Sequence, residues 1–175
     1  DGGNSLCNKK IGIIGVGNIG EDLIKLLSVF DCEIFANDIS ENPLLSKKLK
    51  FKYVSKDFLY RNSDILSIHV PLNAETKNMI NMEVFNKMKK SSILINTSRG
   101  QVVCEKDLIY ALKNNKIHSA ALDVFQNEPI ENKELVNLSN IICTPHIAGN
   151  SKQAVIEMGN SAINHLINFN DEKHN

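Results

Sequence analysis

The fold of this chain is decided by the stretch IGIIGVGNIG, residues Ile11–Gly20. Its first half, Ile11–Gly15, is short and rich in β-branched residues, as is typical of a strand buried on both faces of a sheet. Its second half carries the pattern G-x-G-x-x-G, and apolar residues at helical spacing begin within it and continue beyond it. A buried strand, a glycine-rich turn and a helix in this order predict a dinucleotide-binding unit.

Each glycine of this pattern has its own physical reason. Gly15 permits the tight turn, Gly17 lets the backbone approach a pyrophosphate, and Gly20 lets the helix pack closely on the strand. The N-terminus of the helix adds partial positive charge that stabilises phosphate groups. The alternative is a glycine-rich turn without a ligand, and the acidic residue described next disfavours it.

An acidic residue, Asp38, follows the next predicted strand, 18 positions after Gly20. Dinucleotide-binding units carry a carboxylate about 20 residues after the glycines, where it accepts hydrogen bonds from the adenosine ribose. A carboxylate there also repels a 2′-phosphate, and no Arg or Lys follows until Lys47. The sequence therefore favours NAD over NADP as cofactor. The alternative interpretation is that Asp38 is an ordinary turn residue ahead of Ser40 and Pro43.

The rest of the chain continues to alternate strands and helices. Further strands are expected at Glu33–Asn37, Phe51–Val54, Asp64–Val70, Ser92–Thr97, His118–Val124 and Asn140–Thr144. Helices are expected at Asn18–Phe30, shortly after Pro43, from Ser55 as cap to Arg61, and over Met82–Met88, Lys106–Asn114 and Ser151–Phe169. The last helix is expected to place Ala154, Met158, Ala162, Leu166 and Phe169 on one face.

This alternation predicts an α/β fold of the Rossmann type, doubly wound, with a mostly parallel sheet and helices on both faces. The sequence shows no internal repeat, linker or boundary rich in Pro and Gly, so residues 1–175 are expected to form a single domain.

Composition excludes several classes of function. The chain has 175 residues, with 20 Lys and Arg against 20 Asp and Glu, and lacks the positive charge expected of a nucleic-acid binder. Hydrophobic residues make up 42%, which is typical of globular proteins rather than disordered ones. No signal peptide opens the sequence and no apolar run reaches the ~18 residues that span a membrane. We therefore expect a cytoplasmic protein without nucleic-acid or membrane partners.

The four cysteines indicate neither a metal site nor a disulfide framework. Cys7, Cys32, Cys104 and Cys143 are widely spaced and form no C-x-x-C pair. Two disulfides are possible by number, but Cys32 and Cys143 lie in or beside apolar runs that read as buried strands. Buried free thiols in a reducing compartment are therefore expected, and no metal ligand set is proposed.

Three polar residues follow predicted strands at their carboxyl ends, where a parallel sheet presents catalytic groups. Arg99 follows ILINT, Glu128 lies in the loop after AALDV, and His146 follows NIICT. An imidazole can pass a hydroxyl proton, a nearby carboxylate can raise the pKa of that imidazole, and a guanidinium can clamp a carboxylate. Taken singly, each has a simpler interpretation as a loop or turn residue, and spacing alone does not assign these roles.

Several motifs in order closely resemble the NAD-binding domain of the D-isomer-specific 2-hydroxyacid dehydrogenases. They are GIIGVGNIG, HVPLNAET, ILINTSRGQVV, AALDVFQNEP and TPHIAG, and the resemblance spans roughly Leu6 to Phe169. It implies that Arg99 binds the substrate's carboxylate and carbonyl. It also implies that His146 is the acid/base residue and that Glu128 supports it, which makes these three the catalytic set.

The resemblance also implies a wide set of cofactor contacts. These residues are Gly15, Gly17, Asn18, Ile19, Gly20, Asp38, Val70, Pro71, Thr76, Thr97, Ser98, Arg99, Asp123, His146, Ala148 and Gly149. The position of His69 on a predicted strand also suits a core histidine whose hydrogen bonds are satisfied inside the protein. Cys104 departs from the acidic residue usual after the paired valines, at a position that is not catalytic in the family.

The resemblance implies an NAD-dependent oxidoreductase that acts on a small 2-hydroxy or 2-oxo acid, such as 3-phosphoglycerate in amino-acid biosynthesis. Family members are about twice this long and usually dimerise through the nucleotide domain, so a homodimer is expected. Because Asp1-Gly2-Gly3-Asn4 looks like a boundary cut, we expect the chain to be the cofactor domain of a longer enzyme, inactive alone. The alternative is an NAD(H)-sensing, corepressor-like protein. Formate oxidation is disfavoured because that branch has Gln where this chain has Glu128.

Overall fold

The computed structural model describes residues 3–173, which fall into two compact units that divide between Pro145 and His146. The first unit is built on one sheet in the order β3-β2-β1-β4-β5-β6-β7, and every neighbouring pair is parallel. The strands are β1 (Lys10–Ile14), β2 (Glu33–Asn37), β3 (Lys52–Tyr53), β4 (Ile65–Ile68), β5 (Ile93–Asn96), β6 (Ser119–Leu122) and β7 (Ile141–Cys143). This order is that of the Rossmann fold, so the predicted fold class is confirmed.

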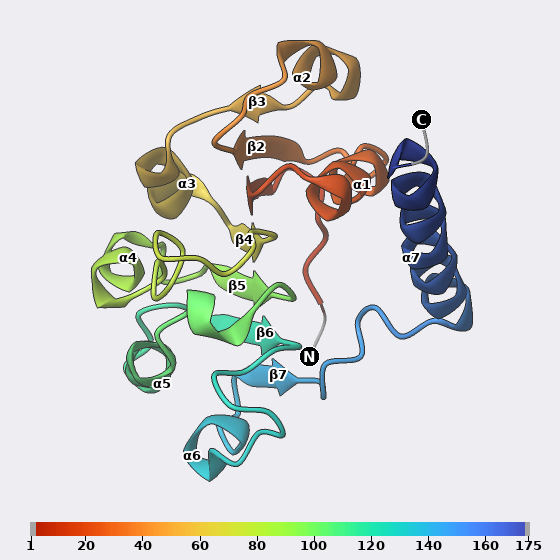
Figure 1. Ribbon diagram of the computed structural model, residues 1–175. Helices are drawn as coiled ribbons and strands as arrows, with labels where there is room; N and C mark the ends of the chain where they lie inside the picture. Colours follow the sequence, from red (N-terminus) through yellow and green to blue (C-terminus); the bar gives the residue numbers. More distant parts are fainter. Residues whose placement is uncertain (1–2, 174–175) are drawn as a thin grey trace. The chain divides into compact units, whose positions relative to one another are not determined.

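Helices cover the sheet of the first unit from two sides (Figure 1). They are α1 (Asn18–Leu27), α2 (Pro43–Leu49), α3 (Lys56–Asn62), α4 (Met82–Lys87), the 3₁₀ helix η1 (Gly100–Val102), α5 (Glu105–Lys113) and α6 (Lys133–Val136). In Figure 1, α1 lies on one face and α3, α4 and α5 lie on the other. The sequence analysis missed η1 and α6, which are too short to show apolar periodicity.

The core divides between the two faces of the sheet. Between the sheet and α1, one cluster includes Ile13 of β1 and Ile24 of α1, both fully buried. Beneath α3, α4 and α5, a larger cluster includes Phe85, Leu94 and Leu108, also fully buried. Each such side chain contributes roughly 1.5–3 kcal/mol relative to leaving it exposed. The sheet is therefore fixed from both sides, and its carboxyl edge is held in a defined position.

Polar side chains cap the short helices where their first N–H groups lack partners. The Oγ of Ser55 accepts a hydrogen bond from Phe58 N at 3.2 Å, so the cap expected from the sequence is confirmed. Asn42, Asn81 and Asn132 cap α2, α4 and α6 in the same way. Such a cap contributes typically about 1 kcal/mol, which matters for helices of only one or two turns.

The cysteines are free, as expected, but their predicted burial holds fully for Cys104 alone. Only Cys104 is buried, while Cys32 and Cys143 are half-buried and Cys7 is exposed. Burial raises the pKa of the Cys143 thiol, which keeps it protonated near pH 7.

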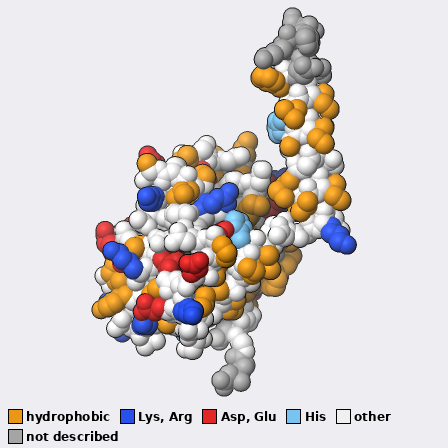
Figure 2. Space-filling model, turned by 60° about the horizontal axis from the view of Figure 1, so that its bottom comes forward, with side chains coloured by type: hydrophobic (Ala, Val, Ile, Leu, Met, Phe, Trp, Pro, Cys, Tyr) orange, Lys and Arg blue, Asp and Glu red, His pale blue; other side chains and the backbone are white. Residues whose placement is uncertain are grey.

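The second unit contains the long helix α7 (Lys152–Lys173). Met158, Leu166 and Phe169 of the predicted apolar face are more than half exposed. Ile156, Ile163 and Ile167 are also more than half exposed, and at 100° per residue they lie on the opposite side of the helix. Hydrophobic side chains are visible along α7 in Figure 2. The prediction of a single apolar face is therefore incomplete, since a helix apolar on several sides is suited to burial.

Candidate functional site

The glycine-rich loop after β1 is shaped by contacts that exclude a side chain at two of its three glycines. Gly15 has φ +95°, and a Cβ there would lie 2.5 Å from the carbonyl oxygen of His69. A Cβ on Gly20 would overlap the carbonyl oxygen of Gly15. At Gly17, by contrast, a Cβ would meet nothing within 4 Å. The loop is therefore tight toward the protein and open above Gly17, which is the space that a pyrophosphate requires.

Asp38 joins the glycine-rich loop to the end of β2. Its Oδ2 accepts a hydrogen bond from Val16 N at 2.6 Å, and its Oδ1 accepts one from Ser40 N at 2.9 Å. The bond from Ser40 N is the contact expected if Asp38 were an ordinary turn residue. The bond from Val16 N is different, because it reaches the glycine-rich loop and an ordinary turn residue does not make it. Each carboxylate oxygen has more than one acceptor position. The Asp38 carboxylate therefore has the geometry and the charge to receive ribose hydroxyls beside the glycines.

A hollow of about 240 Å³ lies between the glycine-rich loop and the segment after β4. Gly15, Gly17, Asp38, Val70, Pro71 and Thr76 of the sequence-predicted set all line it. The sequence analysis missed Asn37, Ile39, Lys56, Asn73, Glu75 and Met79, which line it too. The hollow thus gathers residues from four separate segments at the carboxyl edge of the sheet, where open α/β sheets bind ligands.

Lys56 bears on the preference for NAD over NADP, because it lies near Asp38. The sequence analysis favoured NAD partly because no cation follows Asp38 before Lys47, yet Lys56, at the start of α3, lines the same hollow. A Lys reaches this hollow through the fold rather than through its distance in sequence. The preference for NAD therefore depends on the Asp38 carboxylate alone.

Thr76 shapes the wall of the hollow through its own loop. Its Oγ1 donates to the carbonyl oxygen of Pro71 at 2.7 Å and accepts from Asn73 N at 2.8 Å. The side-chain oxygen of Asn73 in turn accepts from Thr76 N at 2.9 Å. These bonds close the loop between Pro71 and Thr76, so the buried hydroxyl of Thr76 serves the loop and its remaining surface faces the hollow.

His69 lines the hollow and is also partnered inside the protein. Its Nε2 lies 2.8 Å from the Oγ of the buried Ser67. Burial lowers the pKa of His69 below its usual value, so the imidazole is neutral near pH 7. His69 is therefore a histidine whose hydrogen bonding is satisfied inside the protein, as its strand position suggested. Its backbone carbonyl also limits the space at the turn of Gly15.

Farther along the same sheet edge, the loops after β5 and β6 are fastened together. A Cβ on Gly100 would overlap the backbone of Phe125, so only glycine allows this approach. Gln101 Nε2 donates to the carbonyl oxygen of Gln126 at 2.9 Å. Arg99, which is exposed, and Glu128 lie on these two adjoining loops. The structure therefore brings the neighbourhoods of two predicted catalytic residues together.

Thr97, Ser98, Asp123 and Glu128 lie on the loops after β5 and β6, whereas the predicted residues Asn18 and Ile19 begin α1 and are exposed. Thr97 and Ser98 directly follow β5. Asp123 is buried after β6, and its Oδ1 accepts from Thr144 Oγ1 at 2.6 Å. Glu128 Oε1 accepts from Phe125 N at 3.0 Å, which fixes the carboxylate within its own loop. These contacts tie the segments after β5, β6 and β7 into one rim.

His146, Ala148 and Gly149 belong to the second unit and are exposed. His146 has φ +53°, the left-handed region that few residues other than glycine adopt. Such conformations cost of order 1–3 kcal/mol and cluster at functional sites. Asn8, Asp31, Lys50, Asn78 and Asn115 share this backbone region, so the conformation does not by itself single out His146.

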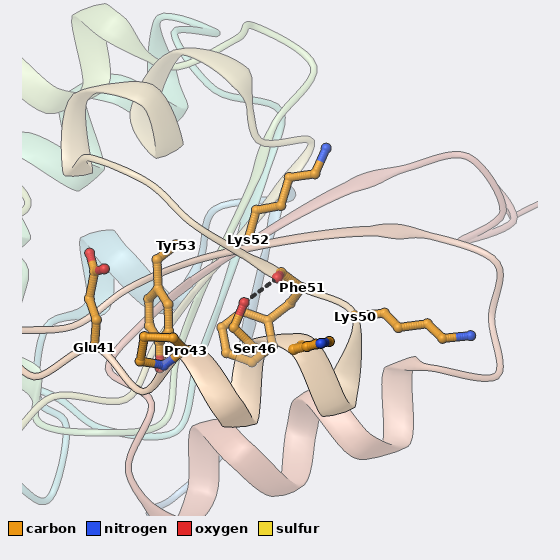
Figure 3. Close-up of a pocket in the computed structure, with 8 residues that line it drawn as sticks. Glu41, Pro43, Ser46, Lys50, Phe51, Lys52 and Tyr53 are labelled. Atoms are coloured by element: carbon orange, nitrogen blue, oxygen red, sulfur yellow. Dashed lines mark hydrogen bonds between the residues drawn. The ribbon is translucent and has the colours of Figure 1, made fainter.

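A larger and more open hollow of about 480 Å³ lies between α2 and β3 (Figure 3). It contains none of the sequence-predicted residues. Lys50 and Lys52 extend in different directions from it, and Ser46 Oγ donates to the carbonyl oxygen of Phe51 at 2.7 Å. That bond closes the end of α2, where Lys50 has φ +57°. The hollow is therefore a feature of the helix end rather than a convergent charged site.

Among residues 3–169, whose side chains the structure describes, no group of three or more His, Cys, Asp or Glu is placed to hold a metal ion. Over the same residues, none of the helices combines the length and the apolar character needed to cross a membrane.

Comparisons with known proteins agree with this geometry. A sequence profile described as the D-isomer specific 2-hydroxyacid dehydrogenase, NAD binding domain, matches residues 1–148. The chain is 40% identical to a glyoxylate reductase of Thermococcus litoralis over 95% of its own length and 50% of that protein. It is 36% identical to a hydroxypyruvate reductase of Thermotoga maritima over 90% of its own length and 51% of that protein.

Solved structures give the same result. The structure of a Lactobacillus jensenii D-lactate dehydrogenase with NAD⁺ superposes with a TM-score of 0.82 at 34% identity, over 89% of this chain and 50% of that one. The chain thus spans about half the length of the relatives it matches. The chain belongs to the D-isomer specific 2-hydroxyacid dehydrogenase family, and residues 1–148 match the NAD-binding domain of that family.

Proposed function

We propose that residues 1–175 are the single cofactor-binding domain of a longer NAD-dependent dehydrogenase. The proposed reaction interconverts a small 2-hydroxy acid and the corresponding 2-oxo acid. The observation that supports it most is the rim at the carboxyl edge of the sheet, where the loops bearing Arg99 and Glu128 are fastened together at the same edge as the glycine-rich loop. Glyoxylate and hydroxypyruvate, named by relatives, and 3-phosphoglycerate, named by the resemblance, are the candidate acids.

Each proposed catalytic residue has a distinct chemical task. The Arg99 guanidinium pairs with the substrate carboxylate and polarises the adjacent carbonyl. His146 accepts or donates the proton of the substrate hydroxyl, and Glu128 keeps the imidazole oriented and basic. Hydride exchange at the nicotinamide is the chemistry that NAD supplies when bound. Asn18, Ile19, Thr97, Ser98, Asp123, Ala148 and Gly149 complete the proposed cofactor contacts.

A panel of 2-oxo acids tests this function. The longer protein should oxidise NADH in the presence of at least one of glyoxylate, hydroxypyruvate, pyruvate and 3-phosphohydroxypyruvate. The loss of NADH absorbance measures this oxidation. The chain of residues 1–175 should bind NADH but show no turnover, because a cleft without its second wall does not orient the acid. Turnover by the short chain would contradict the domain assignment, and a longer protein inactive with every acid would contradict the reaction.

Replacement of Asp38 tests the cofactor preference. Asp38→Ala removes a charged acceptor, whose bonds are worth about 1.5–3 kcal/mol, so NADH affinity should fall roughly 10- to 100-fold. Asp38→Asn is the matched control, because its amide oxygen still accepts from Val16 N while the charge is gone. In Asp38→Asn the ratio of NADPH to NADH affinity should rise, with Lys56 available to the 2′-phosphate. Calorimetric titration measures both constants, and an unchanged ratio would argue against repulsion by Asp38.

Assembly and location are further parts of the proposal. We propose a homodimer formed through this domain, supported by the exposed apolar side chains on two sides of α7, such as Ile163 and Leu166. We also propose a cytoplasmic location, which the free thiols of Cys7 and Cys104 suit. An NAD(H)-sensing, corepressor-like role is the second candidate function. It would keep the NADH binding described above and show no turnover in the longer protein.

A further inference from the structure

A fully buried asparagine, Asn96, organises the turn from which Arg99 extends. Asn96 is the last residue of β5 and is 0% exposed. Its Oδ1 accepts from Ser98 N at 3.0 Å and from Ser98 Oγ at 2.8 Å, while its Nδ2 donates to the carbonyl oxygen of Arg99 at 3.0 Å. A polar side chain is this deeply buried only when its hydrogen bonds are made, and all three of these bonds serve one turn.

The same turn also holds the Arg99 side chain at its far end. Arg99 Nη1 donates to the carbonyl oxygen of Ser98 at 2.6 Å. Asn96 thus binds the N–H of Ser98 and the carbonyl group of Arg99. Between these two groups lies the peptide bond from Ser98 to Arg99, and its carbonyl oxygen accepts the bond from the guanidinium. A buried amide three residues earlier in the chain therefore fixes the backbone from which the exposed Arg99 side chain extends.

We propose that Asn96 is a positioning residue that directs Arg99 toward the carboxylate of a 2-oxo acid, an inference that rests on the proposed function. The rest of the loop is fastened independently, by the close approach of Gly100 to Phe125 and by the bond from Gln101 to Gln126. Loss of the Asn96 bonds should therefore disturb the Arg99 turn and leave the remainder of the rim in place.

The chemistry at this position requires an amide. Asn96 accepts from Ser98 and donates to Arg99 at the same time. In Asn96→Asp the side chain has nearly the same size and still accepts both bonds from Ser98, but a carboxylate oxygen now faces the carbonyl oxygen of Arg99. Asn114→Asp controls for the loss of an amide donor at an exposed position, because Asn114 also donates to a backbone carbonyl, that of Tyr110 at 2.8 Å, at the end of α5.

The kinetic test is a double-mutant cycle in the longer protein, with glyoxylate as substrate and NADH saturating. Asn96→Asp should lower kcat/KM about 100-fold, as misplacement of a catalytic group by an ångström does, and Asn114→Asp should not. In the Arg99→Lys background, Asn96→Asp should cost less than threefold, because the residue acts through Arg99. Losses that multiply in the double variant would show a general structural role and overturn the proposal.

A second measurement needs no turnover. In the chain of residues 1–175, ¹⁵N relaxation of the Arg99 Nε–H group should show a lower order parameter in Asn96→Asp than in the wild type or in Asn114→Asp. An unchanged order parameter in folded Asn96→Asp would overturn the positioning role. A wild-type longer protein inactive on every 2-oxo acid would instead overturn the proposed function.

If Asn96→Asp does not fold, the kinetic and the relaxation measurements can both be made on Ser98→Ala, which removes only the bond from Ser98 Oγ to Asn96 Oδ1. It should lower the Arg99 order parameter and kcat/KM in the same direction by a smaller factor, again with little effect in the Arg99→Lys background. A folded Ser98→Ala variant unchanged in both measurements would contradict the proposal.

Discussion

His146→Gln in the longer enzyme should lower kcat about 10²- to 10⁴-fold and leave the NADH dissociation constant within about threefold of the wild type. Glutamine approximates the size and polarity of histidine but neither accepts nor releases a proton near pH 7. The loss should therefore fall on the chemical step rather than on cofactor binding. Stopped-flow measurement of NADH oxidation, alongside a fluorescence titration of NADH, separates the two effects.

His165→Gln is the matched control for this prediction. His165 lies on the same unit, on α7, where its Nδ1 is 2.8 Å from the carbonyl oxygen of Ser161. The same substitution there should leave kcat within about twofold, because no proton transfer is assigned to His165. Equal losses in the two variants would indicate a general effect on the second unit. A normal kcat in His146→Gln would remove His146 from the catalytic set.

The second large effect is expected at Gly15. In Gly15→Ala the new Cβ would lie 2.5 Å from the carbonyl oxygen of His69, at a φ of +95°. Left-handed backbone costs an alanine roughly 1–2 kcal/mol, and overpacking adds typically 1–3 kcal/mol. The free energy of unfolding should therefore fall by about 2–5 kcal/mol, which corresponds to a fall in Tm of roughly 4–20 °C. NADH binding should weaken as well, since the turn carries the pyrophosphate site.

Gly17→Ala makes the complementary comparison within the same loop. A Cβ on Gly17 meets nothing within 4 Å, so the Tm of this variant should stay within about 2 °C of the wild type. Its NADH affinity should nevertheless fall at least about tenfold, because the methyl group stands where the backbone must approach a phosphate. Differential scanning calorimetry and NADH titration measure both quantities. A loss of stability equal to that of Gly15→Ala would show that Gly17 also serves the fold.

The sequence was sufficient to predict most of the sheet because its strands are short, apolar and separated by turns. β2 was predicted with its observed bounds, and the other strands of the first unit were placed within a few residues. Gly15 and Gly20 could be identified because the tight turn leaves no room for a side chain at either position. These features depend on local backbone geometry, which local sequence determines.

What could not be predicted depends on distant parts of the chain meeting. Lys56 lines the same hollow as Asp38 only because β3 pairs beside β2 and α3 follows it directly. Gln101 appeared in a motif, but its partner, the carbonyl oxygen of Gln126, is known only from the fold. Asn96 reads in the sequence as the polar end of a strand, and its three bonds to one turn required coordinates.

The strand order has a consequence for synthesis on the ribosome. β1 lies between β2 and β4, although α1, β2, α2, β3 and α3 separate it from β4 along the chain. While the polypeptide is emerging, β1 can pair with β2 early, but its other edge has no neighbour until residues 65–68 have been made. An apolar strand with one open edge is a template for pairing with other chains. The free edge of β1 therefore stays open to such pairing until β4 has been made, and the open edge of the sheet then passes to β4, β5 and β6 in turn.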